Sequence, residues 1–312
     1  MTRRLAASLI LLSLAVGVSA QQPTFRISAD LVAVDVLAFR GREPITGLTA
    51  GDFELLDNGV PQEIRSITVP GGAHVIVVLD TSASVEGAVL VNLTLALHAL
   101  LDQLSASDRV SVLTFGDRVR VLARAAEPRA ELAGTLATLT AEGATALHDA
   151  IVIATALGAA DTRPALMVLF TDGADTASWT TATRTLDLLR ASNLVVVTVG
   201  AGLAELPVTA AAVNQPRPYF TSRTWIGTEA TDAPLMLERI AQATGGSFIR
   251  VGRPSTLART FTEIVRRYSR RYVLSYAPQG VGRDDGWHTI EVRLKGQRGT
   301  VQAREGYLAD SR

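Results

Sequence analysis

The stretch Val75-Ile76-Val77-Val78-Leu79-Asp80-Thr81-Ser82-Ala83-Ser84 decides the fold of this 312-residue chain. Its unbroken run of β-branched and aliphatic residues is typical of a strand that is buried on both faces, as in a parallel sheet. The run ends in a D-x-S-x-S pattern, made by Asp80, Ser82 and Ser84. Open α/β sheets bind ligands at the carboxyl ends of their strands, so these oxygens stand where a ligand is expected.

The carboxylate and the two hydroxyls of this pattern are hard oxygen donors. Such donors suit Mg²⁺, Mn²⁺ or Ca²⁺ better than zinc or copper. The same residues also fit a plain strand-to-helix turn, in which Asp80 or a serine caps the next helix. The stretch alone leaves both interpretations open, and the rest of the chain has to distinguish them.

Composition excludes some classes of protein. The formal net charge is +0, so no basic field indicates binding to nucleic acid or to an anionic membrane surface. The chain has no cysteine, so disulfides cannot stabilise it outside the cell. Its stability must come from core burial, for which the length suffices, with a contribution from any bound metal.

Residues 1–20 have the pattern of a secretory signal peptide. A start with Arg3 and Arg4 precedes an apolar run, and Val18-Ser19-Ala20 offers small residues for cleavage. The alternative is an uncleaved anchor, although the run is short for a membrane span. We therefore expect an exported protein, located in the periplasm, at the cell surface or in the medium. No later segment is apolar enough to span a membrane, so none is expected after cleavage.

Two β-rich segments flank the centre of the chain. Residues 21–72 contain alternating strands and Asn58-Gly59, a strong signal for a hairpin turn. Residues 269–312 contain further strands, separated by glycine-rich turns. Each set is too small to bury a core alone, so we expect the two to pair in a small β-sandwich.

Between them, residues 73–268 alternate strands with helices. This alternation predicts an α/β fold with a doubly wound, mainly parallel sheet flanked by helices. Residues 201–231 interrupt the rhythm and are rich in proline. The expected strands are 74–80, 109–115, 119–122, 165–170, 194–199 and 247–251. The expected helices are 87–104, 129–139, one that opens within 142–150 and runs to about 157, 180–191, 234–243 and 255–268.

Two distant places add to the first pattern. Thr145 lies in a glycine-containing loop before a helix, and Asp172 follows a later strand. In a doubly wound sheet, these loops and the one after Asp80 meet at the carboxyl edge. Together they would place two carboxylates and three hydroxyls around one cation, which favours a metal site over a plain turn.

This constellation resembles the metal-ion-dependent adhesion site of the von Willebrand factor type A domain. Asp80, Ser82, Ser84, Thr145 and Asp172 match the motif in the right order, and the resemblance spans residues 73–268. It implies that the hydroxyls bind Mg²⁺ directly, with Mn²⁺ or Ca²⁺ as alternatives. It also implies an open coordination position for an Asp or Glu of a protein partner. The flanking segments are similar, more weakly, to exported bacterial proteins that carry such a domain.

Other residues near these loops have weaker cases. Asp175 could tune the site, but a solvated loop carboxylate fits better. Asp149 follows Thr145 by one helical turn and could brace the loops or lie on the surface. His148 fits packing or exposure better than metal ligation. Trp179 and Trp225 could contact a partner or pack on the sheet.

The sequence supports three hypotheses of function. The first is a non-enzymatic module that captures an acidic residue of a protein partner through a bound metal. The second is an envelope scaffold whose metal stabilises the fold. The third is a metal-dependent hydrolase with Asp80 as nucleophile. Against the third, a haloacid-dehalogenase type of site needs an Asp where this chain has Ser82, and no phosphate-binding or hydrolase motif accompanies the strands.

Overall fold

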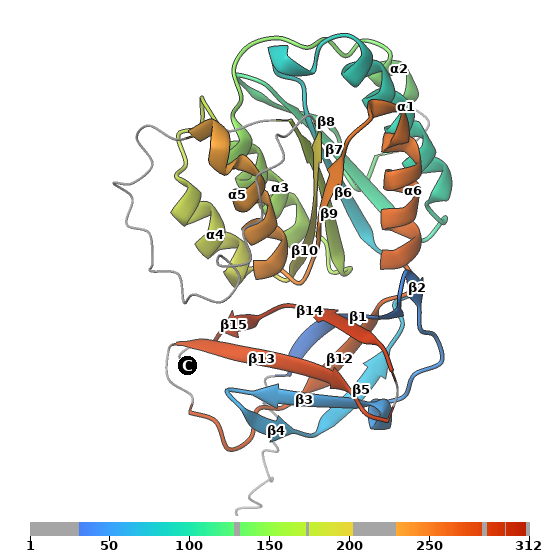
Figure 1. Cartoon of the computed structure of the whole chain (residues 1–312), viewed down its shortest axis with the longest axis vertical. Coiled ribbons are helices and arrows are strands. Elements are labelled where there is room, and N and C mark those ends of the chain that lie inside the picture. Colours follow the sequence, from blue (N-terminus) through green and yellow to red (C-terminus); the bar gives the residue numbers. More distant parts are fainter. Residues whose placement is uncertain are drawn as a thin grey trace, which may run out of the picture. The chain divides into compact units, whose positions relative to one another are not determined.

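A computed structural model of the chain describes residues 31–127, 132–172, 175–201, 229–282, 286–296 and 298–309. These residues form one α/β sheet and two antiparallel sheets (Figure 1). The expected signal peptide lies outside them, as does Trp225. Within the described ranges, no helix has the length and apolar character that a membrane crossing requires.

The α/β sheet has the strand order β11-β10-β9-β6-β7-β8. β6 is its centre and runs parallel to both of its neighbours, β9 and β7. Only β8 is antiparallel to its neighbour in this part of the structure. The strands are β6 (His74–Asp80), β7 (Arg109–Phe115), β8 (Val119–Ala123), β9 (Ala165–Thr171), β10 (Leu194–Ala201) and β11 (Phe248–Val251).

Helices cover both faces of this sheet (Figure 1). α1 and α6 pack against each other on one face, and α3, α4 and α5 lie on the other. The helices are α1 (Ala88–Gln103), α2 (Leu132–Leu136), α3 (Leu147–Ala159), α4 (Ala182–Ala191), α5 (Glu229–Ala243) and α6 (Leu257–Tyr268). Short 3₁₀ turns are formed by Ala50–Asp52, Ala83–Val85 and Pro254–Thr256.

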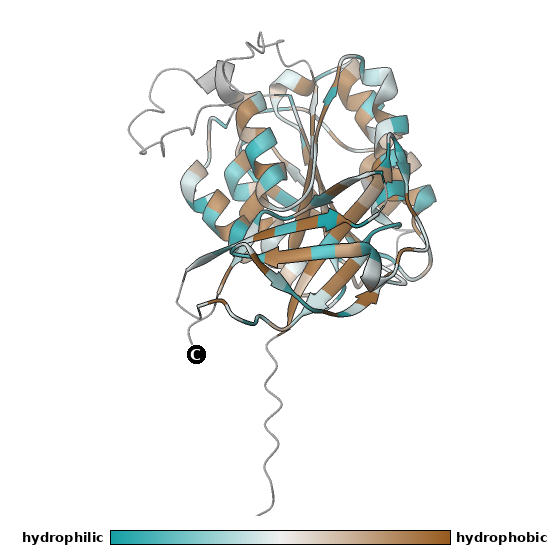
Figure 2. Ribbon diagram, turned by 60° about the horizontal axis from the view of Figure 1, so that its bottom comes forward, coloured by the Kyte–Doolittle hydropathy of each residue, from teal (hydrophilic) through white to brown (hydrophobic). Residues whose placement is uncertain are grey.

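The alternation of side chains along β6 explains why helices pack on both faces of the sheet. Val75, Val77 and Leu79 belong to a core shared with α1 and α6. Ile76 and Val78 belong to a second core, shared with α3 and α5. Since every residue of β6 is buried, the strand has no polar face. Figure 2 shows a mixture of hydrophobic and hydrophilic colour along the helices.

The two antiparallel sheets combine strands from before and after the α/β region. One has the order β14-β1-β12-β5 with β2 beside β1, and the other has the order β15-β13-β3-β4. Their inward side chains share a third core. The strands are β1 (Val32–Arg40), β2 (Glu43–Pro44), β3 (Phe53–Asp57), β4 (Val60–Gln62), β5 (Ile64–Thr68), β12 (Tyr272–Tyr276), β13 (Trp287–Leu294), β14 (Thr300–Ala303) and β15 (Gly306–Leu308).

The predicted fold class is therefore confirmed, including the β segments at both ends. The predicted hairpin also forms: Asn58 and Gly59 have φ of 47° and 77°, and they join β3 to β4. The domain boundaries at 72/73 and 268/269 stay predictions.

One helix start was wrong. The helix expected from Pro234 begins at Glu229, so the proline lies inside α5. Proline is typical of a helix start, and the sequence does not reveal that the helix begins more than a turn earlier. The helix expected over 129–139 is α2, which is shorter, and residues 128–131 lie outside the described ranges.

Candidate functional site

The D-x-S-x-S residues form a tight polar turn at the end of β6. Asp80 is fully buried, and its Oδ1 accepts hydrogen bonds from the Ser82 backbone N–H at 2.9 Å and from the Ser82 hydroxyl at 2.6 Å. The hydroxyl oxygens of Ser82 and Ser84 lie 3.0 Å apart. The oxygens of the turn therefore extend from the buried carboxylate of Asp80 to the exposed Ser84.

The end of β9 completes this arrangement. The Ser84 hydroxyl donates a 2.8 Å hydrogen bond to Asp172 Oδ1, although 88 positions separate the two residues. The Thr171 hydroxyl donates a 2.6 Å bond to Asp80 Oδ2. Two carboxylates and three hydroxyls thus form one continuous chain, Asp172–Ser84–Ser82–Asp80–Thr171. Sequence reasoning missed Thr171, whose only sequence signal was its place as the last residue of a buried strand beside β6.

Thr145 reaches the same edge of the sheet through its backbone. The Gly143 carbonyl accepts a 3.2 Å hydrogen bond from the Ala83 N–H, which ties the Thr145 loop to the D-x-S-x-S turn. Thr145 N–H donates to the Thr176 hydroxyl at 2.9 Å. Thr145 is buried, and among the described residues no hydrogen bond links its hydroxyl to the chain of oxygens. Contacts between the two loops therefore hold Thr145 near the D-x-S-x-S turn, and not a hydrogen bond of its own hydroxyl.

Gly116 allows the Thr145 loop to pack closely against the residue that follows β7. Gly116 follows β7, and a Cβ at this position would lie 2.7 Å from the Glu142 carbonyl oxygen. Real Cβ atoms do not approach a backbone oxygen so closely, so any larger residue would displace the loop. The Gly116 carbonyl also accepts a 2.8 Å hydrogen bond from Ala146 N–H. Gly116 therefore fixes the loop on both sides of Thr145.

Burial and hydrogen bonds act in opposite directions on the pKa of both carboxylates of the site. Burial raises the pKa of Asp80, which hydrogen bonds from Ser82 and Thr171 oppose. Burial also raises the pKa of Asp172, against a hydrogen bond from Ser84. No ion pair within the described ranges includes either carboxylate. Two close carboxylates surrounded by neutral hydroxyls are a donor set that a hard divalent cation fits.

Asp175 and Asp149 hold the loop that follows Asp172. Asp175 accepts hydrogen bonds from the His148 N–H at 3.3 Å, and from the N–H and the hydroxyl of Ser178. Asp149 accepts 2.9 Å bonds from the N–H groups of Trp179 and Thr180. Both carboxylates are thus occupied by the loop. The expectation of a solvated Asp175 was wrong, because the following Ser178 turns back onto it.

The structure also places His148 and Trp179, for which the sequence left alternatives open. His148 is buried, and burial lowers its pKa, so packing is the interpretation that its surroundings support. Trp179 is 96% exposed, so it does not pack on the sheet. A group of three or more His, Cys, Asp and Glu side chains able to hold a metal is absent from the described ranges. The candidate site is therefore one built on hydroxyls.

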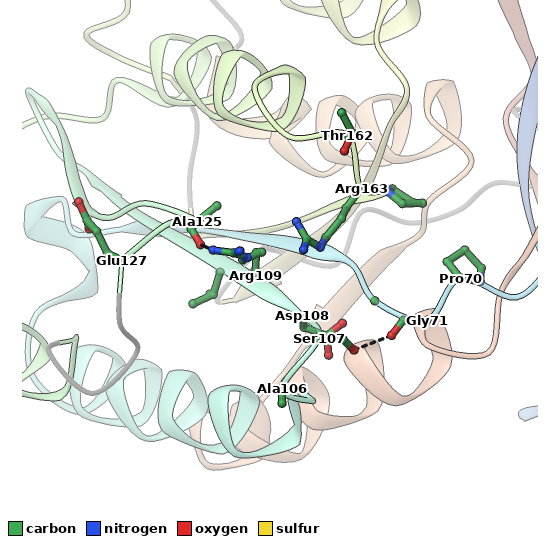
Figure 3. Close-up of a pocket in the computed structure, with 13 residues that line it drawn as sticks. Pro70, Gly71, Ala106, Ser107, Asp108, Arg109, Ala125, Glu127, Thr162 and Arg163 are labelled. Atoms are coloured by element: carbon green, nitrogen blue, oxygen red, sulfur yellow. Dashed lines mark hydrogen bonds between the residues drawn. The ribbon is translucent and has the colours of Figure 1, made fainter.

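A cavity of about 720 Å³ lies at the other edge of the sheet (Figure 3). Its lining comes from the amino-terminal ends of strands: Gly72 precedes β6, Arg109 opens β7 and Pro164 precedes β9. The candidate site is at the carboxyl ends of the same strands. The cavity is therefore not part of the candidate metal site, since parallel strands place their two ends at opposite edges of the sheet.

The sequence model of the von Willebrand factor type A domain matches residues 74–252, which is more than half of the chain. The chain belongs to this family. The fold agrees with a solved structure described as von Willebrand factor type A from Catenulispora acidiphila. That structure has a TM-score of 0.53 and 15% identity, and the match covers 88% of this chain and 75% of the other.

A second similar structure is proximal thread matrix protein 1 from the mussel byssus. Its TM-score is 0.50 and its identity is 18%, with 68% of this chain and 49% of the other covered. At these identities, both likenesses show the fold alone. The comparison with curated proteins gave no match.

Proposed function

We propose that this chain is an exported, metal-dependent protein-binding module with a Mg²⁺-type site. The observation that carries the proposal is the continuous chain of oxygens that joins Asp80 to Asp172, whose two carboxylates form no ion pair within the described ranges. Mn²⁺ and Ca²⁺ are the alternative ions. The ligand residues would be Asp80, Ser82, Ser84, Thr145 and Asp172.

The donor set favours recognition of an anion. Two carboxylates balance the charge of a divalent cation, whereas hydroxyls add oxygens without adding charge. A cation held in this way remains attractive to a further anionic oxygen. We infer that this oxygen comes from an Asp or Glu of a protein partner, because Ser84 brings the site to the surface.

The site is poorly arranged for covalent chemistry. Asp80 Oδ1 accepts two hydrogen bonds and Oδ2 accepts one, so the carboxylate is engaged on both oxygens and is fully buried. A nucleophilic Asp80 would need an accessible oxygen. The proposal is therefore non-enzymatic, and it predicts no metal-dependent release of phosphate from p-nitrophenyl phosphate. Turnover that Asp80→Asn abolishes would favour the hydrolase instead.

Export is part of the proposal and rests on the signal-peptide pattern of residues 1–20. The mature protein would act in the periplasm, at the cell surface or in the medium. Expression with a carboxyl-terminal tag, followed by fractionation and mass measurement of the mature chain, tests this. A mass that still includes residues 1–20 would contradict cleavage.

Calorimetric titration with Mg²⁺ tests the metal site. We expect Asp80→Ala and Asp172→Ala to abolish the binding heat, while Asp187→Ala, an exposed change on α4, leaves it intact. Because Asp80 is buried, circular dichroism must show that its variant folds; Asp172 is only half-buried and gives the safer test. An unchanged isotherm in the Asp172 variant would contradict the assignment.

A scaffold whose metal is structural is the second candidate, and the full burial of Asp80 favours it. The two candidates differ in what chelation changes. If the metal is structural, a chelator should lower the melting temperature strongly without changing partner capture. If it serves recognition, the chelator should abolish capture at a temperature where the protein stays folded.

A further inference from the structure

Arginines gather where the end of α6 meets the turn between β1 and β2. Residues 250–271 contain seven arginines and one glutamate, and they contain no aspartate or lysine. The whole chain is balanced at +0, so this excess is local and the net charge conceals it. The arginines on this part of the surface, called the basic patch below, are Arg40, Arg42, Arg266, Arg267, Arg270 and Arg298.

Contacts join the end of α6 to the turn between β1 and β2. Arg266 forms an ion pair with Glu43 at 3.6 Å. The guanidinium carbon of Arg267 lies 5.0 Å from the ring centre of Phe39, which is on β1. Figure 1 shows β2 next to the end of α6. The arginines of these two segments therefore lie on one continuous surface.

The loop between β13 and β14 belongs to the same surface. Arg40 Nε donates a 3.2 Å hydrogen bond to the Arg298 carbonyl in this loop. Arg42 is also close to α6, as the titration of Glu263 indicates. Hydrogen bonds from Arg266 lower the pKa of Glu263, and the charge of Arg42 adds to this effect.

The positive charge of the patch is only partly balanced within the fold. Six arginines and two glutamates leave an excess of four positive charges. Basic residues in the last turn of a helix stabilise its dipole, but Arg42, Arg270 and Arg298 lie outside α6. These three are exposed, and none of them has an ion pair within the described ranges. Repulsion among the arginines therefore favours an anion from outside.

The basic patch and the candidate metal site lie at opposite edges of the α/β sheet. β11 runs parallel to β10, β9 and β6, so it ends at the carboxyl edge, where Asp80 ends β6. α6 then returns along the sheet, and its 12 residues span about 18 Å. Its last turn is therefore at the amino edge. A surface that binds the patch leaves the metal site facing away from it.

We propose that the basic patch binds the mature protein to a membrane surface that carries anionic lipid. Arginine suits headgroup phosphates, because its planar fork donates two hydrogen bonds to one phosphate. Export favours lipid over nucleic acid, since residues 1–20 would direct the chain out of the cytoplasm. The inference thus rests on the export in the proposed function, but not on the metal. On the membrane, the protein presents its metal site outward to a partner.

Co-sedimentation with lipid vesicles tests the inference. The protein is residues 21–312, because the apolar run near the start of the chain would itself bind lipid, and residues 31–312 form one compact unit. Vesicles contain phosphatidylcholine alone, or phosphatidylcholine with about one-third phosphatidylglycerol, an anionic lipid. A chelator is present throughout, so that the candidate metal site does not contribute.

We expect binding to the anionic vesicles at low salt and none to phosphatidylcholine alone. Salt at about 1 M should abolish the binding, because it screens charges beyond about 3 Å. Arg42→Gln, Arg270→Gln and Arg298→Gln together should weaken it about a hundredfold, since each arginine near an anionic surface contributes about fivefold. Equal binding to both kinds of vesicle would overturn the inference.

The matched control removes the same charge elsewhere. It combines Arg118→Gln, Arg124→Gln and Arg184→Gln, three exposed arginines outside the patch. This variant should bind the anionic vesicles like the wild type. If both triple variants lose binding equally, net charge and not the basic patch is responsible, and the inference is overturned.

A fluorescent label tests the orientation. The chain has no cysteine, so one introduced cysteine can carry a dye that brightens in lipid. The dye should brighten on anionic vesicles in Thr46→Cys, two residues after β2, and not in Arg118→Cys, in the turn between β7 and β8 at the carboxyl edge. The reverse result would overturn the inference.

Heparin, a soluble polyanion, tests the other class of partner. If the protein ignores anionic vesicles but binds heparin, and the patch variant loses this binding, the patch serves a soluble polyanion and the lipid is wrong. Because every measurement includes a chelator, these outcomes are independent of Mg²⁺ binding. Failure of the basic patch therefore leaves the proposed metal site standing, and failure of the metal site leaves the patch.

Discussion

The hydroxyl of Thr171 donates a 2.6 Å hydrogen bond to Asp80 Oδ2, in a position where both groups are fully buried. The two residues end adjacent parallel strands, β9 and β6. Without this hydroxyl, one oxygen of a buried carboxylate loses the donor that β9 supplies. Thr171 therefore supports the candidate site from beneath, and it is the first target for substitution.

Thr171→Val should destabilise the metal-free protein by about 1–3 kcal/mol, the cost of leaving a buried polar group unsatisfied. Valine keeps the shape, so a cavity does not contribute. Urea unfolding in the presence of a chelator measures the change, and Thr171→Ser should recover most of it. The matched control is Thr155→Val, where the hydroxyl donates a 2.8 Å hydrogen bond to the carbonyl of Ile151 within α3 and, in the described ranges, none to a carboxylate. Equal losses at both positions would contradict a special role for Thr171.

Gly116→Ala should weaken Mg²⁺ binding by about tenfold or more, the usual effect of disturbing the residues that orient metal ligands. The added Cβ would meet the Glu142 carbonyl at 2.7 Å and push the Thr145 loop away from the D-x-S-x-S turn. Calorimetry measures the affinity. Gly134→Ala is the control, since nothing lies within 4 Å of its added Cβ. Unchanged Mg²⁺ affinity in Gly116→Ala would show that the loop position is not critical.

Asp149 should contribute stability that depends on pH. Partial burial alone would raise its pKa, but hydrogen bonds from Trp179 and Thr180 outweigh burial and hold the pKa below the ordinary value of 3.8. A lowered pKa means that the stabilisation is complete above pH 3.8 and is lost as the pH falls through the pKa of the folded protein.

Asp149→Asn should therefore cost about 1–3 kcal/mol at neutral pH, and the difference from the wild type should narrow as the pH falls below 3.8. Urea unfolding across this pH range gives both values. Asp187→Asn serves as the control, because that carboxylate is largely exposed on α4. A loss at Asp149 that is the same at all pH values would point to the shape of the side chain and not to its charge.

Among the charged residues between α6 and β12, we expect substitution of Arg271 to lower the stability most. It is 2% exposed, its Nε donates a 2.8 Å bond to Asp35 on β1, and its Nη1 donates to the Tyr268 carbonyl at the end of α6. Arg271→Leu should cost about 3–5 kcal/mol, because it leaves a largely buried carboxylate unpaired.

Chemical unfolding measures this loss, and the double variant Arg271→Leu, Asp35→Leu should recover part of it. Arg293→Ala, in an exposed pair with Glu291, should leave the unfolding midpoint unchanged. If the double variant is no more stable than Arg271→Leu, the arginine acts through packing on Tyr268, whose ring centre is 3.9 Å away.

The sequence could predict those parts of the fold that local patterns encode. The run from Val75 to Leu79 predicted a strand buried on both faces, because only such a strand has no polar side. The turn at Asn58-Gly59 was predicted because both residues tolerate positive φ. The start of α5 was not predictable in this way, since Pro234 fits a helix start and the residues before it have no clear apolar period.

What the sequence determined by itself is the family and the oxygens of the D-x-S-x-S turn, because Asp80, Ser82 and Ser84 are neighbours in one short pattern and their spacing is local. What only the tertiary structure decided is how distant residues meet. It placed Thr171 under Asp80, Ser84 against Asp172, and the backbone of Trp179 on Asp149, so that the indole faces water. Such contacts depend on the order of strands and on loop closure, and a one-dimensional pattern does not contain them.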